Sequence, residues 1–85
     1  MAIDILYFAR IREAVGRSAE SLSPPDDVAT IADLVDWLAT QGVGYAEAFA
    51  DRGRLRAAID QRFVDPMTPI AGAREISLFP PVTGG

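Results

Sequence analysis

The chain has 85 residues, of which 49% are hydrophobic and 24% charged, and its formal net charge is −4. This composition is typical of one globular domain, and an acidic chain with eight scattered cations is a poor match for nucleic acid. Cysteine and histidine are both absent, which excludes disulfides and thiol nucleophiles, removes the commonest general base, and leads us to expect no metal site.

The first elements predicted along the chain are a strand, a helical turn and a second strand. Residues 2–8 (AIDILYF) alternate, with Asp4 toward solvent and the opposite side formed by Ile3, Ile5 and Tyr7. Residues 9–16 lack this alternation and end on a glycine, as a short helical turn does. Residues 19–22 predict a weaker strand that pairs with the first, before the SPPDD break at 23–27.

The clearest helix signal lies in residues 30–42 (TIADLVDWLATQG). Thr30 is the expected N-cap, Asp33 completes a capping box, and Gly42 is the expected end. Apolar residues at helical spacing form one stripe suited to packing on a sheet: Ile31, Leu34, Val35 and Leu38. Trp37 is interpreted as a further packing residue.

The second half of the chain predicts short elements. Residues 45–50 favour another short helix, and the last strand is expected at residues 74–79. Between them, two short strands at 55–60 and 63–64 flank a turn at Asp60 and Gln61. Residues 65–72 contain two prolines and are expected to form a loop.

This order predicts an α+β fold, a mixed sheet with one main helix packed on one face. The other face is then open, and pleat alternation directs to it Leu6, Phe8, Ser77 and Phe79, with Phe63 as a further candidate. An exposed apolar patch on a small protein usually marks a partner surface. The alternative is that these rings are core residues in a different strand register.

The chain closes on FPPVTGG at residues 79–85, which we interpret as a compact domain of residues 1–79 followed by an extended tail of residues 80–85. Pro80 and Pro81 hold the backbone extended, and Gly84 and Gly85 have no side chains to obstruct entry into a narrow slot. Six residues reach about 20 Å, so this tail could thread a partner's active site.

The group that such a tail would deliver is the carboxylate of Gly85, which is ionised at neutral pH and is a poor electrophile. It must be activated before it can react, and the chain has no Walker-type glycine-rich loop to bind ATP. We therefore expect a separate activating enzyme.

All eight cations are arginines, and lysine is absent. A chain without ε-amines would spare its activated tail from self-attack, although plain composition bias explains the same fact. The run of Arg52, Arg54 and Arg56 is interpreted as a solvated edge, with an acidic patch on a partner as the alternative.

Two stretches, ILYFARIREAVG at 5–16 and EISLFPPVTGG at 75–85, carry a family resemblance. They resemble the small subunits of molybdopterin synthase, which belong to the ubiquitin-like β-grasp sulfur carriers. By this resemblance we expect the β-grasp fold, and apolar or cationic partner contacts at Phe8, Arg12, Phe63 and Phe79. Many members of that family have AVNQ where this chain has AIDQ at 58–61, so we expect Asp60 to alter a hydrogen bond of the turn.

The resemblance also implies the chemistry. An activating enzyme would use ATP to adenylate Gly85, and sulfur would replace the adenylate to give a C-terminal thiocarboxylate (1-thioglycine). The tail would then enter the large synthase subunit and donate sulfur to cyclic pyranopterin monophosphate, through insertion of Pro80, Pro81, Val82, Thr83 and Gly84. The chain would bind no cofactor itself, and would be the non-catalytic donor subunit of a heterotetramer whose active site lies on the partner.

Two alternatives remain open at this point: a sulfur carrier for thiazole, thiamine or another thiocarboxylate pathway, and a ubiquitin-like tag or binding module. No apolar run approaches the length of a membrane span, and the first residues lack a secretory signal pattern. We therefore expect a cytoplasmic protein.

Overall fold

The computed structural model describes residues 2–81, so the predictions for Val82, Thr83, Gly84 and Gly85 lie outside the described residues. The strands are β1 (Ile3–Tyr7), β2 (Ala19–Leu22), β3 (Arg56–Ile59), β4 (Arg62–Val64) and β5 (Glu75–Phe79). The helices are α1 (Ala9–Val15), α2 (Ile31–Leu38), α3 (Val43–Ala48) and the 3₁₀ helix η1 (Arg52–Arg54). None of the helices within residues 2–81 has the length and apolar character needed to span a bilayer.

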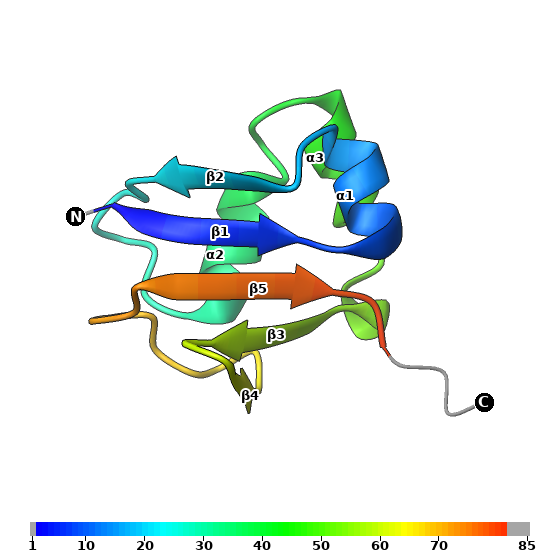
Figure 1. Cartoon of the computed structure of the whole chain (residues 1–85). Helices are drawn as coiled ribbons and strands as arrows, with labels where there is room; N and C mark the ends of the chain where they lie inside the picture. The colour runs from blue at the N-terminus through cyan, green and yellow to red at the C-terminus, as the bar shows by residue number, and fades with distance from the viewer. Residues whose placement is uncertain (1, 82–85) are drawn as a thin grey trace.

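The strands form one mixed sheet in the order β2-β1-β5-β3-β4 (Figure 1). The central strands β1 and β5 are parallel, and the other neighbouring pairs are antiparallel. The predicted mixed sheet is therefore confirmed. Because β1 and β5 run in the same direction, they finish at the same end of the sheet. The chain enters α1 from that end, and Pro80 and Pro81 also leave β5 there.

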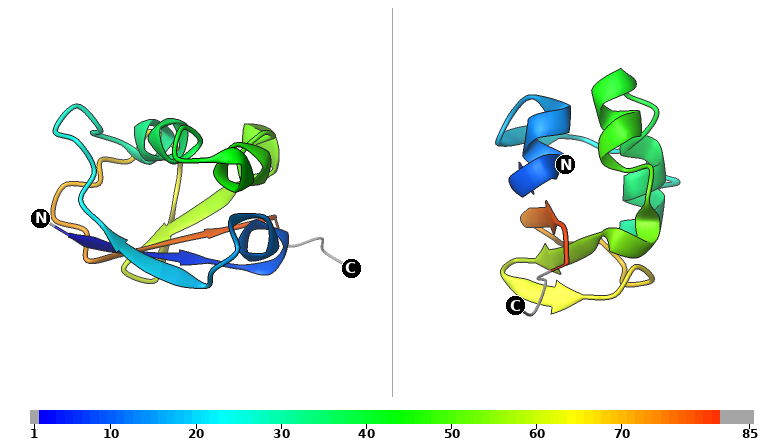
Figure 2. Two further views of the ribbon diagram at one scale, coloured as in Figure 1. Left: turned by 90° about the horizontal axis from the view of Figure 1, so that it is seen from above. Right: turned by 90° about the vertical axis from the view of Figure 1, so that its right-hand side faces the viewer.

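Helices α2 and α3 lie on one side of the sheet, and α1 lies at its end, next to α3 (Figure 2). The core fills the space between the sheet and this layer, with fully buried side chains of Ile5, Leu34, Leu38, Phe49, Ile76 and Leu78. The whole predicted stripe of α2 is buried, and the alternation in β1 and β5 directs the expected side chains inward. Within residues 2–81, no helix covers the opposite face of the sheet.

The start of α2 forms the predicted capping box, in which Thr30 Oγ1 accepts from the Asp33 N–H and Asp33 Oδ2 accepts from the Thr30 N–H. The predicted end at Gly42 is wrong, because α2 ends at Leu38. The side chains of Thr40 and Gln41 both donate to the carbonyl of Trp37. This carbonyl therefore has hydrogen-bond donors other than a backbone N–H of a further helical turn. Gly42 instead precedes α3 as its N-cap.

The turn between β3 and β4 is built by Asp60 and Gln61, whose φ values of 48° and 71° are left-handed and typical of a two-residue hairpin turn. Asp60 Oδ1 accepts from the backbone N–H groups of Arg74 (3.2 Å) and Glu75 (2.9 Å). Asp60 therefore fastens the hairpin to the start of β5. An asparagine oxygen could accept the same two bonds, so the difference from the family pattern is one of charge.

A polar cluster joins the sheet to α3. The hydroxyls of Tyr7 and Tyr45 donate to Glu20 Oε2 over 2.7 and 2.6 Å, and Arg17 contacts Glu20 Oε1 at 3.1 Å. Burial raises the pKa of Tyr7 and of Tyr45, and the hydrogen bond to Glu20 raises both further. Both phenols therefore remain protonated donors at neutral pH and connect three elements that are far apart in the sequence.

Candidate partner-binding surface

A row of side chains crosses the face of the sheet that the helices leave open. Leu6 pairs with Ser77, Ser77 with Ala58, and Ala58 with Phe63, so the row runs across β1, β5, β3 and β4. Paired residues share one face of a sheet. Since the alternate residues Ile76 and Leu78 are fully buried against the helices, this row faces outward, as the pleat argument predicted.

Three of the four phenylalanines lie on or beside this face. Phe8 is 44% exposed and Phe63 is 84% exposed, whereas the fourth, Phe49, is fully buried. Phe79 is half-buried, and its ring lies 5.7 Å from that of Phe63, measured between centroids. The alternative that these three rings form part of the core is therefore wrong.

The rings surround a hollow of about 580 Å³, which we call the tail-base hollow. It is lined by Phe8, Ala9, Ala58, Gln61, Phe63, Ser77, Phe79, Pro80 and Pro81. The structure thus brings together the three predicted phenylalanines and the first two residues of the predicted tail. Sequence reasoning did not identify Ala9, Ala58 and Gln61, although their small or polar side chains beside the large rings give the hollow its shape.

Phe8 reaches the hollow because the chain turns sharply from β1 into α1. Its N–H donates to the carbonyl of Leu78 in β5 over 3.2 Å, and its own carbonyl accepts from Ile11 and Arg12 in the first turn of α1. Ala9 takes a left-handed φ of 52° at this corner. The side chain of Arg12 is exposed on α1 and does not line the hollow.

Among the described side chains that line the tail-base hollow, none is acidic or basic. Within residues 2–81 there is also no group of three or more carboxylates placed to hold a metal ion. Acid or base catalysis at this surface would need titratable groups from another molecule. The hollow is suited to apolar contact with a partner.

A second hollow of about 580 Å³ lies on the helix side, between α2, η1 and the edge strand β4. Its walls are mostly apolar, and the ion pair between Arg52 and Asp36 (2.8 Å) borders it. Phe63 lines both hollows. This ring therefore forms a ridge on the sheet edge between the two.

The family model that matches this chain is that of the ThiS family, over residues 5–85. The chain belongs to the ThiS family. The match spans every strand and helix of the structure except the first two residues of β1. The matched residues of this ThiS-family chain therefore include Phe8, Phe63 and Phe79, the three rings of the tail-base hollow.

Two curated relatives of this ThiS-family chain carry the name molybdopterin synthase sulfur carrier subunit. The Escherichia coli protein is 39% identical and the Haemophilus influenzae protein 37% identical, each over 83 residues that cover 98% of this chain and 99% of the relative. Among solved structures, SAMP1 from Haloferax volcanii covers 100% of both chains with a TM-score of 0.71 and 24% identity, which supports the fold alone. The predicted family resemblance and the ubiquitin-like fold are confirmed.

Proposed function

We propose that this ThiS-family chain is the sulfur carrier subunit of a molybdopterin synthase and acts in molybdenum cofactor biosynthesis. The observation that carries the proposal is its similarity, over nearly the full length, to two proteins of that name. The tail-base hollow supports it, because a carrier needs a surface that docks on a second protein. The partner we propose is the large synthase subunit, and the place of action is the cytoplasm.

The reactive group in this proposal is the carboxylate of Gly85, which lies outside the described residues. A separate activating enzyme makes it electrophilic: a carboxylate oxygen attacks the α-phosphorus of ATP, and pyrophosphate leaves. A donor at the sulfide level, such as hydrosulfide, then attacks the acyl carbon and AMP leaves; loss of the proton gives a thiocarboxylate on Gly85. Adenylation is needed because an ionised carboxylate is negatively charged and resists attack by a nucleophile such as the sulfur donor.

The open face would direct the loaded tail. Pro80 and Pro81 are half-buried and line the hollow, so a protein that covers the hollow also contacts the base of the tail. We propose that the tail, residues 80–85, enters the active site of the large subunit, where the thiocarboxylate gives its sulfur to cyclic pyranopterin monophosphate. In the resulting assembly of two small and two large subunits, this chain positions the donor and the large subunit supplies the catalytic residues.

Intact mass spectrometry tests this function. After incubation with the activating enzyme of the same organism, ATP and a sulfur source, the chain should gain about 16 Da as one oxygen becomes sulfur. Mixed with the large subunit and the pterin substrate, the loaded chain should return to its original mass as product forms. If this chain gains no mass under conditions in which the same enzyme loads another sulfur carrier, the proposal is overturned.

Deletion of Gly85 is the matched control, because a chain terminus contributes little packing. The variant should unfold at the same temperature as the parent chain and transfer no sulfur. The two alternatives give other products. A ubiquitin-like tag would form higher-mass adducts with amines of other proteins, and a thiazole-pathway carrier would show the same gain in mass but would not form molybdopterin.

A further inference from the structure

The arginines are unevenly distributed along the sheet. Strands β1 and β5 end, and strands β2 and β3 begin, at the side from which Pro80 and Pro81 leave. Helix α1 follows β1 and η1 precedes β3 at that same side. Six of the eight arginines lie in α1, in the turn between α1 and β2, in η1 or at the start of β3: Arg10, Arg12, Arg17, Arg52, Arg54 and Arg56.

Acidic side chains gather at the opposite end. Asp4 and Glu75 pair in register at the starts of β1 and β5, and Asp60 is hydrogen-bonded to the backbone of Glu75. Asp26 and Asp27 lie in the connection that follows β2, which finishes at this end. A chain with a net charge of −4 therefore presents a concentration of cations where the tail begins.

Four of these six arginines form no ion pair with the described residues: Arg10, Arg12, Arg54 and Arg56. Arg17 pairs with Glu20, and Arg52 pairs with Asp36. Arg54 and Arg56 are exposed and form no ion pair with the described residues, and we call these two residues the arginine rim.

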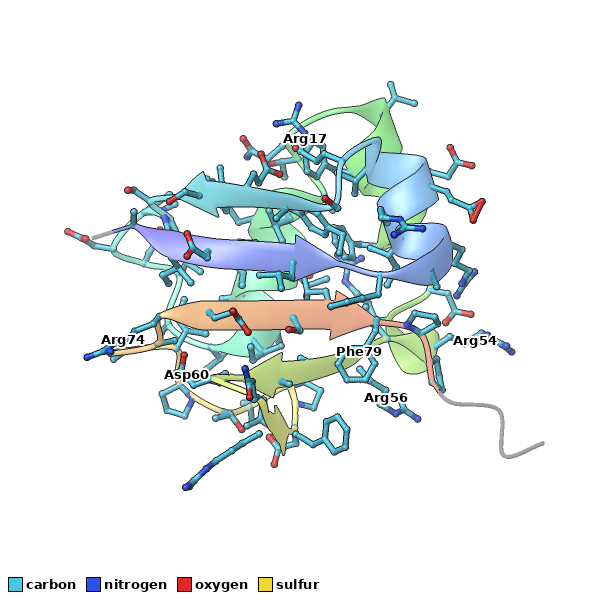
Figure 3. The ribbon with its side chains drawn as sticks, in the orientation of Figure 1. Arg17, Arg54, Arg56, Asp60, Arg74 and Phe79 are labelled. Carbon is cyan, nitrogen blue, oxygen red and sulfur yellow. The ribbon has the colours of Figure 1, made fainter. Side chains whose placement is uncertain are left out.

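The arginine rim adjoins the tail-base hollow. Arg56 is opposite Phe79 in the register of β3 and β5. Its guanidinium donates to the carbonyls of Gly53 (3.2 Å) and Leu55 (2.9 Å), which holds the side chain along the start of β3. Figure 3 shows Arg54, Arg56 and Phe79 at the end of the sheet from which the tail leaves.

We propose that the arginine rim binds carboxylates on the large synthase subunit, beside the apolar contacts of the tail-base hollow. This inference rests on the proposed function and extends it by predicting a negative charge on the surface of the large subunit that meets the rim. Protein interfaces have an apolar centre with a charged rim, and an arginine fork matches a carboxylate with two parallel hydrogen bonds. Within residues 2–81 neither rim residue is tied to an internal carboxylate, so both guanidinium charges remain available to a partner.

The separation of charge along the sheet gives the rim a second effect. Carboxylates on the part of the large subunit that meets the arginine rim attract this end of the chain and repel the end that carries Asp4, Asp60 and Glu75. The chain is therefore turned with its tail toward the partner before contact, and productive encounters become more frequent.

Association kinetics test this proposal. Stopped-flow measurements would compare the parent chain with Arg54→Glu and Arg56→Glu, and with Arg74→Glu as the matched control. Arg74 is also exposed and lies at the acidic end, so the change in net charge is the same. At low salt we expect each rim variant to associate with the large subunit about tenfold more slowly, and the control within about twofold of the parent. At about 0.5 M salt the difference should largely disappear.

The outcomes separate this proposal from the proposed function. Equal rates for Arg56→Glu and Arg74→Glu, with sulfur transfer intact in the parent, would overturn the arginine rim and leave the carrier function standing. A parent chain that does not bind the large subunit would overturn both. Arg56→Lys keeps the charge and should associate at nearly the parent rate, whereas Arg56→Gln should be slowed; the reverse order would also overturn the rim.

Discussion

The side-chain hydrogen bonds that join β1, β2 and α3 depend on the carboxylate of Glu20. It accepts hydrogen bonds from Tyr7 and Tyr45 and pairs with Arg17, so one side chain of β2 joins β1, α3 and the segment before β2. A half-buried charge is stable in this position because three donors surround it. Tyr7 and Tyr45 are the two tyrosines of the chain, which makes their titration accessible to a simple experiment.

The first prediction concerns stability at high pH. In the unfolded chain each tyrosine ionises near its ordinary pKa of about 10, whereas in the folded chain the pKa of Tyr7 and of Tyr45 is raised. The stability that these two phenols contribute is therefore fully present below pH 10. It is lost as the pH rises further, because the unfolded state releases protons that the folded state retains. For Tyr7 alone the loss is about 1.4 kcal/mol per pH unit above 10.

The matched variant is Tyr7→Phe/Tyr45→Phe, which removes both titrating phenols. Urea unfolding from pH 8 to 11 should show a falling free energy for the parent and a nearly flat one for the variant. At pH 8 the variant should be less stable by about 1 to 3 kcal/mol, because Glu20 loses two donors. Equal slopes above pH 10 would contradict the role given to the two phenols.

Helices α1 and α3 lie close together at Gly44. A Cβ atom added to Gly44 in α3 would overlap the backbone carbonyl of Ala14 in α1. The absence of a side chain at Gly44 is therefore what allows these two short helices to touch. Since α1 starts directly after Phe8, its position also fixes one ring of the tail-base hollow.

We predict that Gly44→Ala lowers the free energy of unfolding by about 1 to 3 kcal/mol, because α1 must move away from α3. The control is Gly53→Ala, since a Cβ at Gly53 would meet only the Asp51 carboxylate at an ordinary 3.5 Å; this change should stay within about 0.5 kcal/mol. Urea unfolding measures both. A Gly44→Ala variant as stable as the control would show that the helices can separate without loss.

For the whole molecule, the arrangement of two faces decides what the protein can do. One face of the sheet is covered by helices and contains the core, and the other displays Phe8, Phe63 and Phe79 around the place where the tail begins. The same end of the sheet carries the exposed Arg54 and Arg56. The tail-base hollow, the arginine rim, Pro80 and Pro81 thus lie on one side of the molecule, where a single partner could contact all of them.

Substitution of Phe63 tests whether the open face of the sheet binds the large subunit. Because its side chain is 84% exposed, Phe63→Ser should change the free energy of unfolding by less than about 0.5 kcal/mol. Loss of a large ring from the ridge between two hollows should weaken binding to the large subunit at least about tenfold. Val43→Ser is the control, since Val43 is 86% exposed on α3, away from both hollows. Titration calorimetry distinguishes the two, and equal affinities would argue against an interface at Phe63.

Most of the local structure followed from the sequence. The period-two pattern of β1 and β5 predicted which side chains are buried, and the capping box predicted the start of α2. The end of α2 did not follow, because Gly42 is an acceptable helix end and the bonds of Thr40 and Gln41 to Trp37 depend on rotamers that a sequence does not display. The lining of the hollow by Ala58 and Gln61 was missed for a similar reason: small or polar residues carry no periodic signal of their own.

The sequence by itself determined the family, the identity of the tail residues and the face on which each long strand displays its side chains, because these depend on residue order and on the alternation of neighbouring side chains. Only the tertiary structure decided that Phe8, Phe63 and Phe79 line one hollow. They come from separate segments and are brought together by the parallel pairing of β1 with β5 and the placement of β3 and β4 beside them. Strand order is set by burial of the shared core, which no short stretch of sequence contains.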